Sequence, residues 1–195
     1  MARDFLVEHG ASVVGGVMSP VSDHYGKSGL LSSIHRLEMC RLSVVDSDWI
    51  TVDDWEIKQP KYLPTRRVLD RLQEELRRRS GCQASQRMAS LILLCGADML
   101  DSFNTPGVWD PEDMNVILGK YGVVCIERVG TDSTKLIDGS AILSPFKNNI
   151  FLVPPTVSND VSSTALREIA KANKSLKYLI ADAVITYIKQ HHLYK

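Results

Sequence analysis

The stretch IFLVPPTVSNDVSSTALR, residues 150–167, decides the fold because it joins an apolar run to the first turn of an amphipathic helix. We expect residues 150–153 to form a strand, residues 159–162 a polar turn, and the residues from Ser163 onward a helix. Strand, turn and helix in this order form the repeating unit of α/β folds with parallel strands.

The start of this helix is a candidate anion site. The first N–H groups of a helix have no partner within it, and the helix dipole makes that end positive. Ser163 and Arg167 lie one helical turn apart, so both can face one phosphate group. Helix capping by Asp160 and Ser162 explains the same residues equally well, and both interpretations stay open at this point.

Composition limits the classes of protein and partner. The chain has 195 residues, of which 44% are apolar and 24% charged, which suits one globular domain with a substantial core. Lys and Arg total 23 and Asp and Glu total 23, so the net charge is zero, and we expect neither nucleic acid nor a membrane as a partner. No apolar stretch has the length of a membrane span, and no signal-peptide pattern occurs in the sequence.

The 4 cysteines lie far apart and form neither a CxxC motif nor a pair with metal-ligand spacing, so we predict no metal site among the side chains. Cys95 and Cys125 lie inside apolar runs, where we expect small buried side chains. This pattern favours a reducing intracellular compartment, cytoplasm or nucleus, over a fold built on disulfides.

Apolar runs alternate with amphipathic segments along the chain. The expected strands are residues 13–18, 49–52, 91–95, 123–126 and 150–153, and the expected helices are residues 1–9, 34–45, 65–79, 110–119, a segment from 163, and 175–194. The alternation predicts an α/β fold, a doubly wound and mostly parallel sheet with helices on both faces. Ligands of such sheets bind at the carboxyl ends of the strands, where the polar residues of this chain gather. The last segment is expected to pack on the sheet.

Several short motifs occur in a specific order and spacing. They are Ser19-Pro20-Val21-Ser22-Asp23 with Tyr25 and Lys27, His35-Arg36 with Met39, Asp53 with Trp55-Glu56, Leu93-Leu94-Cys95-Gly96-Ala97-Asp98, Pro106 with Trp109, Tyr121-Gly122, and Asn159-Asp160-Val161-Ser162-Ser163-Thr164 with Arg167. With these motifs the chain closely resembles the eukaryotic nicotinamide/nicotinate mononucleotide adenylyltransferases over nearly its full length. The resemblance implies a Rossmann-like nucleotidyltransferase fold.

The resemblance also implies a reaction of NAD biosynthesis, in which ATP and a pyridine mononucleotide form the dinucleotide and pyrophosphate. The 5′-phosphate attacks the α-phosphorus of ATP directly, Mg²⁺ assists, and no side chain acts as a nucleophile. The protein therefore has to align two phosphates and offset charge in the transition state. The choice between the amide and the acid mononucleotide, and the formation of a homo-oligomer, stay open.

The family's roles transfer to the positions that match. For ATP and its phosphates the resemblance implies Ser163, Thr164, Arg167, Asn159 and Lys27. For the mononucleotide and dinucleotide it implies Tyr25, Tyr62, Thr65, Gly96, Asp98, Trp109 and Arg128. Tyr62 and Trp109 would flank the pyridine ring by stacking, and Asp98 would bind ribose hydroxyls. Arg128 would contact the adenylate half together with Asn159.

Simpler roles compete with these. Asp98 and Thr65 can each cap a helix, and Lys27 can be a solvated loop charge. Trp109 and Tyr62 can be ordinary core residues. Two positions depart from the family: Tyr62 stands where the family usually has Trp, and Ser28 where many members have a second lysine.

The start of the chain departs further. The family begins with a strand and a Gly-Ser-Phe-Asn-Pro motif that a histidine follows, and these would precede Met1. We therefore expect residues 1–195 to be a single nucleotidyltransferase domain that lacks its N-terminal strand and phosphate-binding motif, with no identified catalytic residue. The missing strand would be central, so we expect two half-sheets with exposed inner edges, and little adenylyl transfer.

Two other functions remain as alternatives to the adenylyltransferase. One is a catalytically impaired fragment that acts only as a nucleotide- or partner-binding module. The other is an adenylyl or cytidylyl transferase for a different acceptor, against which Tyr62 and Trp109 argue because they suit a flat pyridine.

Overall fold

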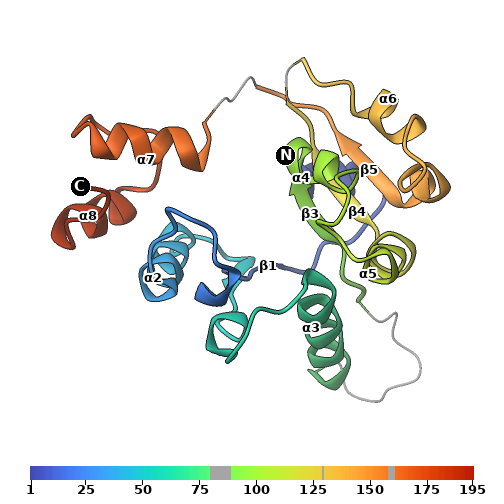
Figure 1. Cartoon of the computed structure of the whole chain (residues 1–195), viewed down its shortest axis with the longest axis horizontal. Coiled ribbons are helices and arrows are strands. Elements are labelled where there is room, and N and C mark those ends of the chain that lie inside the picture. The colour runs from blue at the N-terminus through green and yellow to red at the C-terminus, as the bar shows by residue number, and fades with distance from the viewer. Residues whose placement is uncertain (80–88, 129, 158–160) are drawn as a thin grey trace. The chain divides into compact units, whose positions relative to one another are not determined.

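The computed structural model describes residues 1–79, 89–128, 130–157 and 161–195 (Figure 1). The chain divides into two compact units, and each is described by itself. The first unit contains Met1–Val13 and Pro64–Asn159, and the second contains Val14–Leu63 and Asp160–Lys195.

The first unit is built on a parallel sheet of three strands in the order β3-β4-β5 (Figure 1). The strands are β3 (Leu93–Gly96), β4 (Val123–Ile126) and β5 (Ile150–Val153). Leu93 lies opposite Val123, and Val123 lies opposite Ile150. All of β4 is buried or half-buried, as expected for a short apolar run in a central parallel strand.

Helices accompany this sheet and supply most of its core. They are α1 (Ala2–Glu8), α3 (Thr65–Arg79), α4 (Ala97–Ser102), α5 (Pro111–Val116) and α6 (Ser133–Asp138), with a π-helical turn at Ile117–Tyr121 and a 3₁₀ helix at Ser144–Asn149. Leu100, Phe103, Ile117 and Leu143 are at most 1% exposed and form the centre of the core. The core thus includes residues of the segments that connect β3 with β4 and β4 with β5.

The second unit contains a parallel pair of strands and three α-helices. The strands β1 (Gly16–Met18) and β2 (Ile50–Val52) pair with Gly16 opposite Ile50. The helices are α2 (Ser33–Ser43), α7 (Ser163–Lys171) and α8 (Asp182–Gln190), and short 3₁₀ helices lie at Asp23–Tyr25 and Glu56–Lys58.

The expected α/β class is confirmed, with parallel strands in open sheets flanked by helices. In the described ranges these strands form two sheets, one of two strands and one of three. Strands 123–126 and 150–153 have the predicted bounds, whereas β1 and β2 are shorter than predicted.

Three predictions about helices are wrong. Within residues 175–194 only Asp182–Gln190 is α-helical, and Tyr178 before it has a φ of 66°, which a helix does not allow. The buried side chains Val184 and Ile188 do not pack on a sheet. They pack with residues of α2 and α7, such as Met39, because these helices present matching apolar faces. Thr65 begins α3 as its first residue rather than preceding it as a cap.

Candidate functional site

The first turn of α7 gathers hydroxyl groups and one guanidinium. Ser162 is the N-cap of the helix, and its side chain accepts a hydrogen bond from the Ala165 N–H at 3.2 Å. Ser163 and Thr164 follow it and are exposed. Arg167 Nη2 donates to Thr164 Oγ1 at 3.1 Å, so the guanidinium is held at the positive end of the helix. Capping by Ser162 is therefore confirmed. The same turn still offers hydroxyl groups and a guanidinium that can bind an anion.

A loop on the second unit carries Tyr25 and Lys27, and both side chains are exposed. The rings of Tyr25 and Tyr62 lie side by side, with centroids 5.4 Å apart. Asp23 anchors this loop to α2, because its carboxylate accepts bonds from the Ser33 N–H at 2.7 Å and from Arg36 Nη2 at 2.8 Å. Burial raises the pKa of Asp23, but these bonds lower it by more, so the net shift is downward.

The start of the same loop, just after β1, is tied to a buried carboxyl group. Ser19 Oγ donates to Glu56 Oε2 at 2.7 Å, and Glu56 is only 7% exposed. Burial raises the pKa of Glu56 in spite of the hydrogen bond from Ser19. Both residues belong to motifs that the sequence singles out, but their pairing was not predicted because they lie far apart along the chain.

In the first unit, Asp98 and Arg128 meet just beyond the carboxyl ends of β3 and β4. Arg128 Nη1 lies 3.0 Å from Asp98 Oδ2, and the two side chains are 45% and 74% exposed. An exposed ion pair of this kind adds little stability, so a ligand can replace either partner at small cost. Gly96, which ends β3, is the N-cap of α4. The interpretation of Asp98 as the helix cap is therefore wrong, because Asp98 lies inside the first turn.

Trp109 is half-buried and fixed on two sides. Its Nε1 donates to Ser102 Oγ at 3.1 Å, and Ser102 Oγ in turn donates to the Met99 carbonyl at 2.6 Å. The indole meets the Phe103 ring edge-on, with centroids 4.8 Å apart. Sequence reasoning missed Ser102, since only the folded turn brings it to the indole. Core packing thus fixes the position of Trp109, which is also what a stacking platform requires.

A further polar contact holds the backbone next to Arg128. The Arg128 N–H donates to Thr131 Oγ1 at 3.1 Å, and the same hydroxyl donates back to the Arg128 carbonyl at 2.6 Å. Thr131 was also missed by sequence reasoning. The spacing of a hydroxyl three residues after the arginine is the signal that could have found it.

The structure groups several of the predicted residues within each unit. The second unit holds Tyr25, Lys27, Tyr62, Ser163, Thr164 and Arg167, and the first holds Thr65, Gly96, Asp98, Trp109 and Arg128. Contacts join Thr164 with Arg167, Tyr25 with Tyr62, and Asp98 with Arg128. Asn159 lies outside the described residues.

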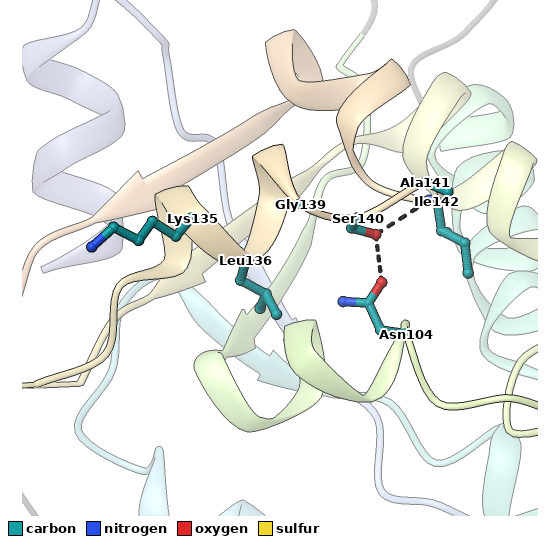
Figure 2. A pocket seen from close by; sticks show the side chains of 7 residues that line it. All are labelled: Asn104, Lys135, Leu136, Gly139, Ser140, Ala141 and Ile142. Atoms are coloured by element: carbon teal, nitrogen blue, oxygen red, sulfur yellow. Dashed lines mark hydrogen bonds between the residues drawn. The ribbon is translucent and has the colours of Figure 1, made fainter.

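A hollow of about 470 Å³ lies elsewhere in the first unit, beside the turn that follows α6 (Figure 2). None of the predicted site residues lines it. Ser140 Oγ donates to the Asn104 side chain and accepts from the Ile142 N–H at 3.2 Å and the Leu143 N–H at 3.0 Å. These bonds close the turn, so the Ser140 hydroxyl is already engaged in hydrogen bonds within the protein.

Within the described ranges, no three His, Cys, Asp or Glu side chains come close enough together to hold a metal ion. In the same part of the chain, no helix has an apolar stretch of the length needed to cross a membrane.

Comparison with known proteins identifies the family. The cytidylyltransferase-like family model matches residues 3–169, which include residues of both units. The chain belongs to this family of nucleotidyltransferases. The resemblance seen in the motifs is confirmed by relatives that match this chain over its full length.

Three relatives carry closely similar names. A rice protein, from Oryza sativa subsp. japonica, is 44% identical over 195 residues, which cover 100% of this chain and 78% of the relative. An Arabidopsis thaliana protein is 46% identical over 194 residues, covering 100% of this chain and 81% of the relative. Both are named nicotinamide/nicotinic acid mononucleotide adenylyltransferase. A Bos taurus protein with that name and the number 1 is 36% identical over 227 residues, covering 100% of this chain and 81% of the relative.

Proposed function

We propose that this nucleotidyltransferase transfers the adenylyl group of ATP to nicotinamide or nicotinate mononucleotide, which forms NAD or its deamido form and pyrophosphate. The names of the rice, Arabidopsis and bovine relatives support the reaction. The observation that carries the proposal in this chain is the first turn of α7, where Thr164 and Arg167 meet at the positive end of a helix.

The α7 turn suits the triphosphate of ATP. Its N–H groups, its hydroxyls and the Arg167 guanidinium all favour negative charge, and Arg can bind two phosphate oxygens at once. Charge develops on the phosphate oxygens during adenylyl transfer, so donors fixed in advance stabilise the transition state. Arg167 would offset that charge, while Ser163 and Thr164 would orient the phosphates. Asn159 and Lys27 would add contacts to ATP.

The first unit suits the ribose and base portions. Asp98 accepts hydrogen bonds only, so its carboxylate matches the two hydroxyls of a ribose. Arg128 would contact the adenylate half once it leaves Asp98. Trp109, fixed by Ser102, would stack on a pyridine ring. The resemblance implies the same role for Tyr62, which belongs to the second unit. Tyr25, Thr65 and Gly96 would complete the surroundings of the mononucleotide.

We propose Mg²⁺ as the metal that enters with ATP. Mg²⁺ usually keeps several waters and is held by substrate phosphates with one or two carboxylates, so it needs no cluster of protein ligands. The donor set around the α7 turn fits this arrangement, since it offers cations and hydroxyls to the phosphates rather than carboxylates to the metal. Bound to ATP, the ion would neutralise phosphate charge.

We also propose that both units belong to one nucleotidyltransferase domain spanning residues 1–195, because the family model spans residues of both. A reducing compartment, cytoplasm or nucleus, is supported by the free thiols of Cys40, Cys95 and Cys125.

The purified protein incubated with MgATP and nicotinamide mononucleotide tests the reaction, with NAD and pyrophosphate measured by chromatography. We expect both products in equal amounts, and we expect Arg167→Ala to slow their formation strongly. Arg167→Lys is the matched control, since it keeps the charge and loses the paired donors. Binding of ATP without turnover would instead support a binding module. Turnover with another phosphorylated acceptor, but not with either mononucleotide, would support a different transferase.

A further inference from the structure

The helix α7, which carries the candidate anion turn, has few attachments to the rest of its unit. None of its residues is buried. In the part of the chain that the structure describes, its side chains form hydrogen bonds and ion pairs only within the helix, as Arg167 does with Thr164. The position of α7 therefore depends on apolar packing.

The apolar face of α7 packs against a small group of buried side chains. We call this group the α8 cluster, and it consists of Leu176, Val184 and Ile188. Leu166 and Ile169 of α7 are half-buried against it. Leu166 directly precedes Arg167, so a shift of this face moves the guanidinium with it.

The chain after α8 returns to the same cluster through a tight turn. His192, with a φ of 51°, donates from its N–H to the Lys189 carbonyl at 3.2 Å. The Leu193 N–H donates to the Ile188 carbonyl at 3.0 Å. These two bonds form a Schellman motif, which ends a helix at a residue in the left-handed conformation. Leu193 packs against the α8 cluster, and Tyr194 follows it.

Tyr194 is held in a strained backbone conformation. Its φ is 62°, and a bulky residue other than glycine rarely adopts this region. Such strain persists only where the surrounding contacts outweigh it. Here the half-buried ring packs against the α8 cluster, on which Leu166 of α7 also packs. The strained turn thus places an aromatic ring beside the attachment of α7.

Two guanidinium groups act on the phenol of this ring. Burial raises the pKa of Tyr194, and the positive charges of Arg167 and Arg36 oppose that shift. Arg36 on α2 is already fixed from outside its own helix, since its Nη2 donates to Asp23 Oδ1 at 2.8 Å. Arg167 has only its bond with Thr164, one turn away in the same helix. Tyr194 therefore lies near the less constrained of the two arginines.

We propose that Tyr194 is a positioning residue for the phosphate site. Its ring holds α7 against the α8 cluster and thereby keeps the Arg167 guanidinium at the first turn of the helix. The ring itself does not contact the phosphates. This inference rests on the proposed function, in which Arg167 binds the phosphates of ATP.

Hydrogen exchange without any ligand tests the packing role. We expect the amides of α7 to exchange faster in Tyr194→Ala than in the wild type, and Tyr194→Phe to restore the wild-type rates because it keeps the ring. Tyr178→Ala is the matched control, since Tyr178 has a similar φ of 66° but is 92% exposed. Tyr194→Leu, which keeps part of the apolar contact, replaces the alanine variant if that variant fails to fold.

Steady-state kinetics test the consequence for the phosphates. We expect Tyr194→Ala to raise the KM for MgATP about tenfold, which corresponds to about 1.4 kcal/mol of binding free energy. The KM for the mononucleotide should stay unchanged, whereas a general loss of structure would raise both. Calorimetry with inorganic tripolyphosphate should show the same tenfold loss of affinity without turnover. In an Arg167→Ala background Tyr194→Ala should cause little further loss, because the ring acts through that arginine.

The measurements separate this inference from the proposed function. Wild-type protein that neither binds tripolyphosphate nor forms the dinucleotide would count against the proposed function. Wild-type exchange rates in α7 of Tyr194→Ala would overturn the role of Tyr194. So would an unchanged affinity for tripolyphosphate in that variant, or an equal loss of affinity in Tyr178→Ala.

Discussion

Single hydrogen bonds decide how the side chains of the candidate site are held. Trp109 has one polar atom, and that atom is bound by Ser102 Oγ at 3.1 Å. Arg128 is held at its backbone by Thr131 and at its guanidinium by Asp98. In each case a neighbouring side chain holds the residue that is expected to meet the ligand. Positioning, rather than reactive side chains, is what a direct transfer between two phosphates requires.

Ser102→Ala should lower the stability of the protein and weaken the binding of the mononucleotide. The indole N–H would lose its acceptor in a half-buried position, which costs about 1 to 2 kcal/mol. Trp109 would then be less well fixed, so we expect a higher KM for the mononucleotide and an unchanged KM for ATP. Urea unfolding and steady-state kinetics measure these effects. Ser102→Thr, which keeps the hydroxyl, is the control, and an alanine variant with the wild-type KM would contradict the positioning role.

At the scale of elements, α3 is joined to the π-helical turn by one carboxylate. Asp70 on α3 accepts from Tyr121 Oη at 2.5 Å and from Lys120 Nζ at 2.8 Å. Burial raises the pKa of Asp70, but these two bonds and the nearby positive charges lower it by more, so the net shift is downward. A carboxyl group whose pKa is lower in the folded state stabilises that state when it is ionised.

Asp70→Ala should therefore destabilise the protein by about 1 to 2 kcal/mol at neutral pH. Because the folded pKa lies below the unfolded value near 3.8, the difference from wild type should be complete above that pH. It should disappear as the pH falls through the lower folded value. Urea unfolding from pH 3 to pH 7 measures it. Asp70→Asn keeps the shape and removes the charge, so it should lose a similar amount at neutral pH. A loss that stays the same from pH 3 to pH 7 would show that ionisation is irrelevant.

The π-helical turn ends at a glycine that no other residue can replace without strain. Gly122 has a φ of 76°, and a Cβ atom there would lie 2.9 Å from the Asn149 carbonyl oxygen. Asn149 also donates from Nδ2 to the Leu118 and Gly119 carbonyls, both at 3.0 Å, and so closes the end of the turn. The strand β4 begins at Val123, directly after this glycine.

Gly122→Ala should destabilise the first unit, because the backbone has to leave the left-handed region or push Asn149 away. We expect a loss of about 2 to 3 kcal/mol, in line with strained positions of this kind. Thermal unfolding measures the loss. Gly130→Ala is the matched control, since Gly130 has a φ of 88° with nothing within 4 Å of the added Cβ. If the two variants lost equal stability, the contact with Asn149 would not matter.

At the scale of the whole molecule, each of the two units contains predicted ligand contacts. Ser163, Thr164 and Arg167 belong to the second unit, and Asp98 and Arg128 belong to the first. A ligand that binds only the folded state stabilises every part it contacts. Protection of the predicted contact residues within each unit is thus a consequence of the proposed function.

Hydrogen exchange with and without NAD tests that consequence. We expect slower exchange of amides in two places, the first turn of α7 and the turn from Gly96 to Asp98 that begins α4. Arg167→Ala should reduce the protection of the first turn of α7, because that turn then lacks its guanidinium. Unchanged exchange in both places would argue against the predicted ligand contacts.

The sequence predicts most of the elements because their patterns are local. β4 and β5 are continuous apolar runs with the predicted bounds, and α5 begins at an Asp110 cap that accepts from Glu112 and Asp113. The candidate residues Ser163 to Arg167 are likewise readable from one turn of helix. The stretch before α8 was not predicted, since its positive φ at Tyr178 leaves no mark in the hydrophobic pattern.

Contacts between distant residues are the part that sequence reasoning could not supply. The pairs Asp98–Arg128, Ser102–Trp109 and Ser19–Glu56 depend on how turns and strands meet. The opposition of Cys95 and Cys125 depends on strand register, which a shift of one residue would abolish.

The ion pair between Asp98 and Arg128 has a consequence for the response to ionic strength. Salt screens exposed charges, with a Debye length of about 8 Å at physiological concentration. Added salt therefore weakens the pair and frees the carboxylate for a ribose, while it also weakens the hold of the α7 turn on phosphates. Added salt should thus weaken the binding of a nucleoside triphosphate more than the binding of the nucleoside. Calorimetric titration of both ligands at two ionic strengths would measure this difference in affinity.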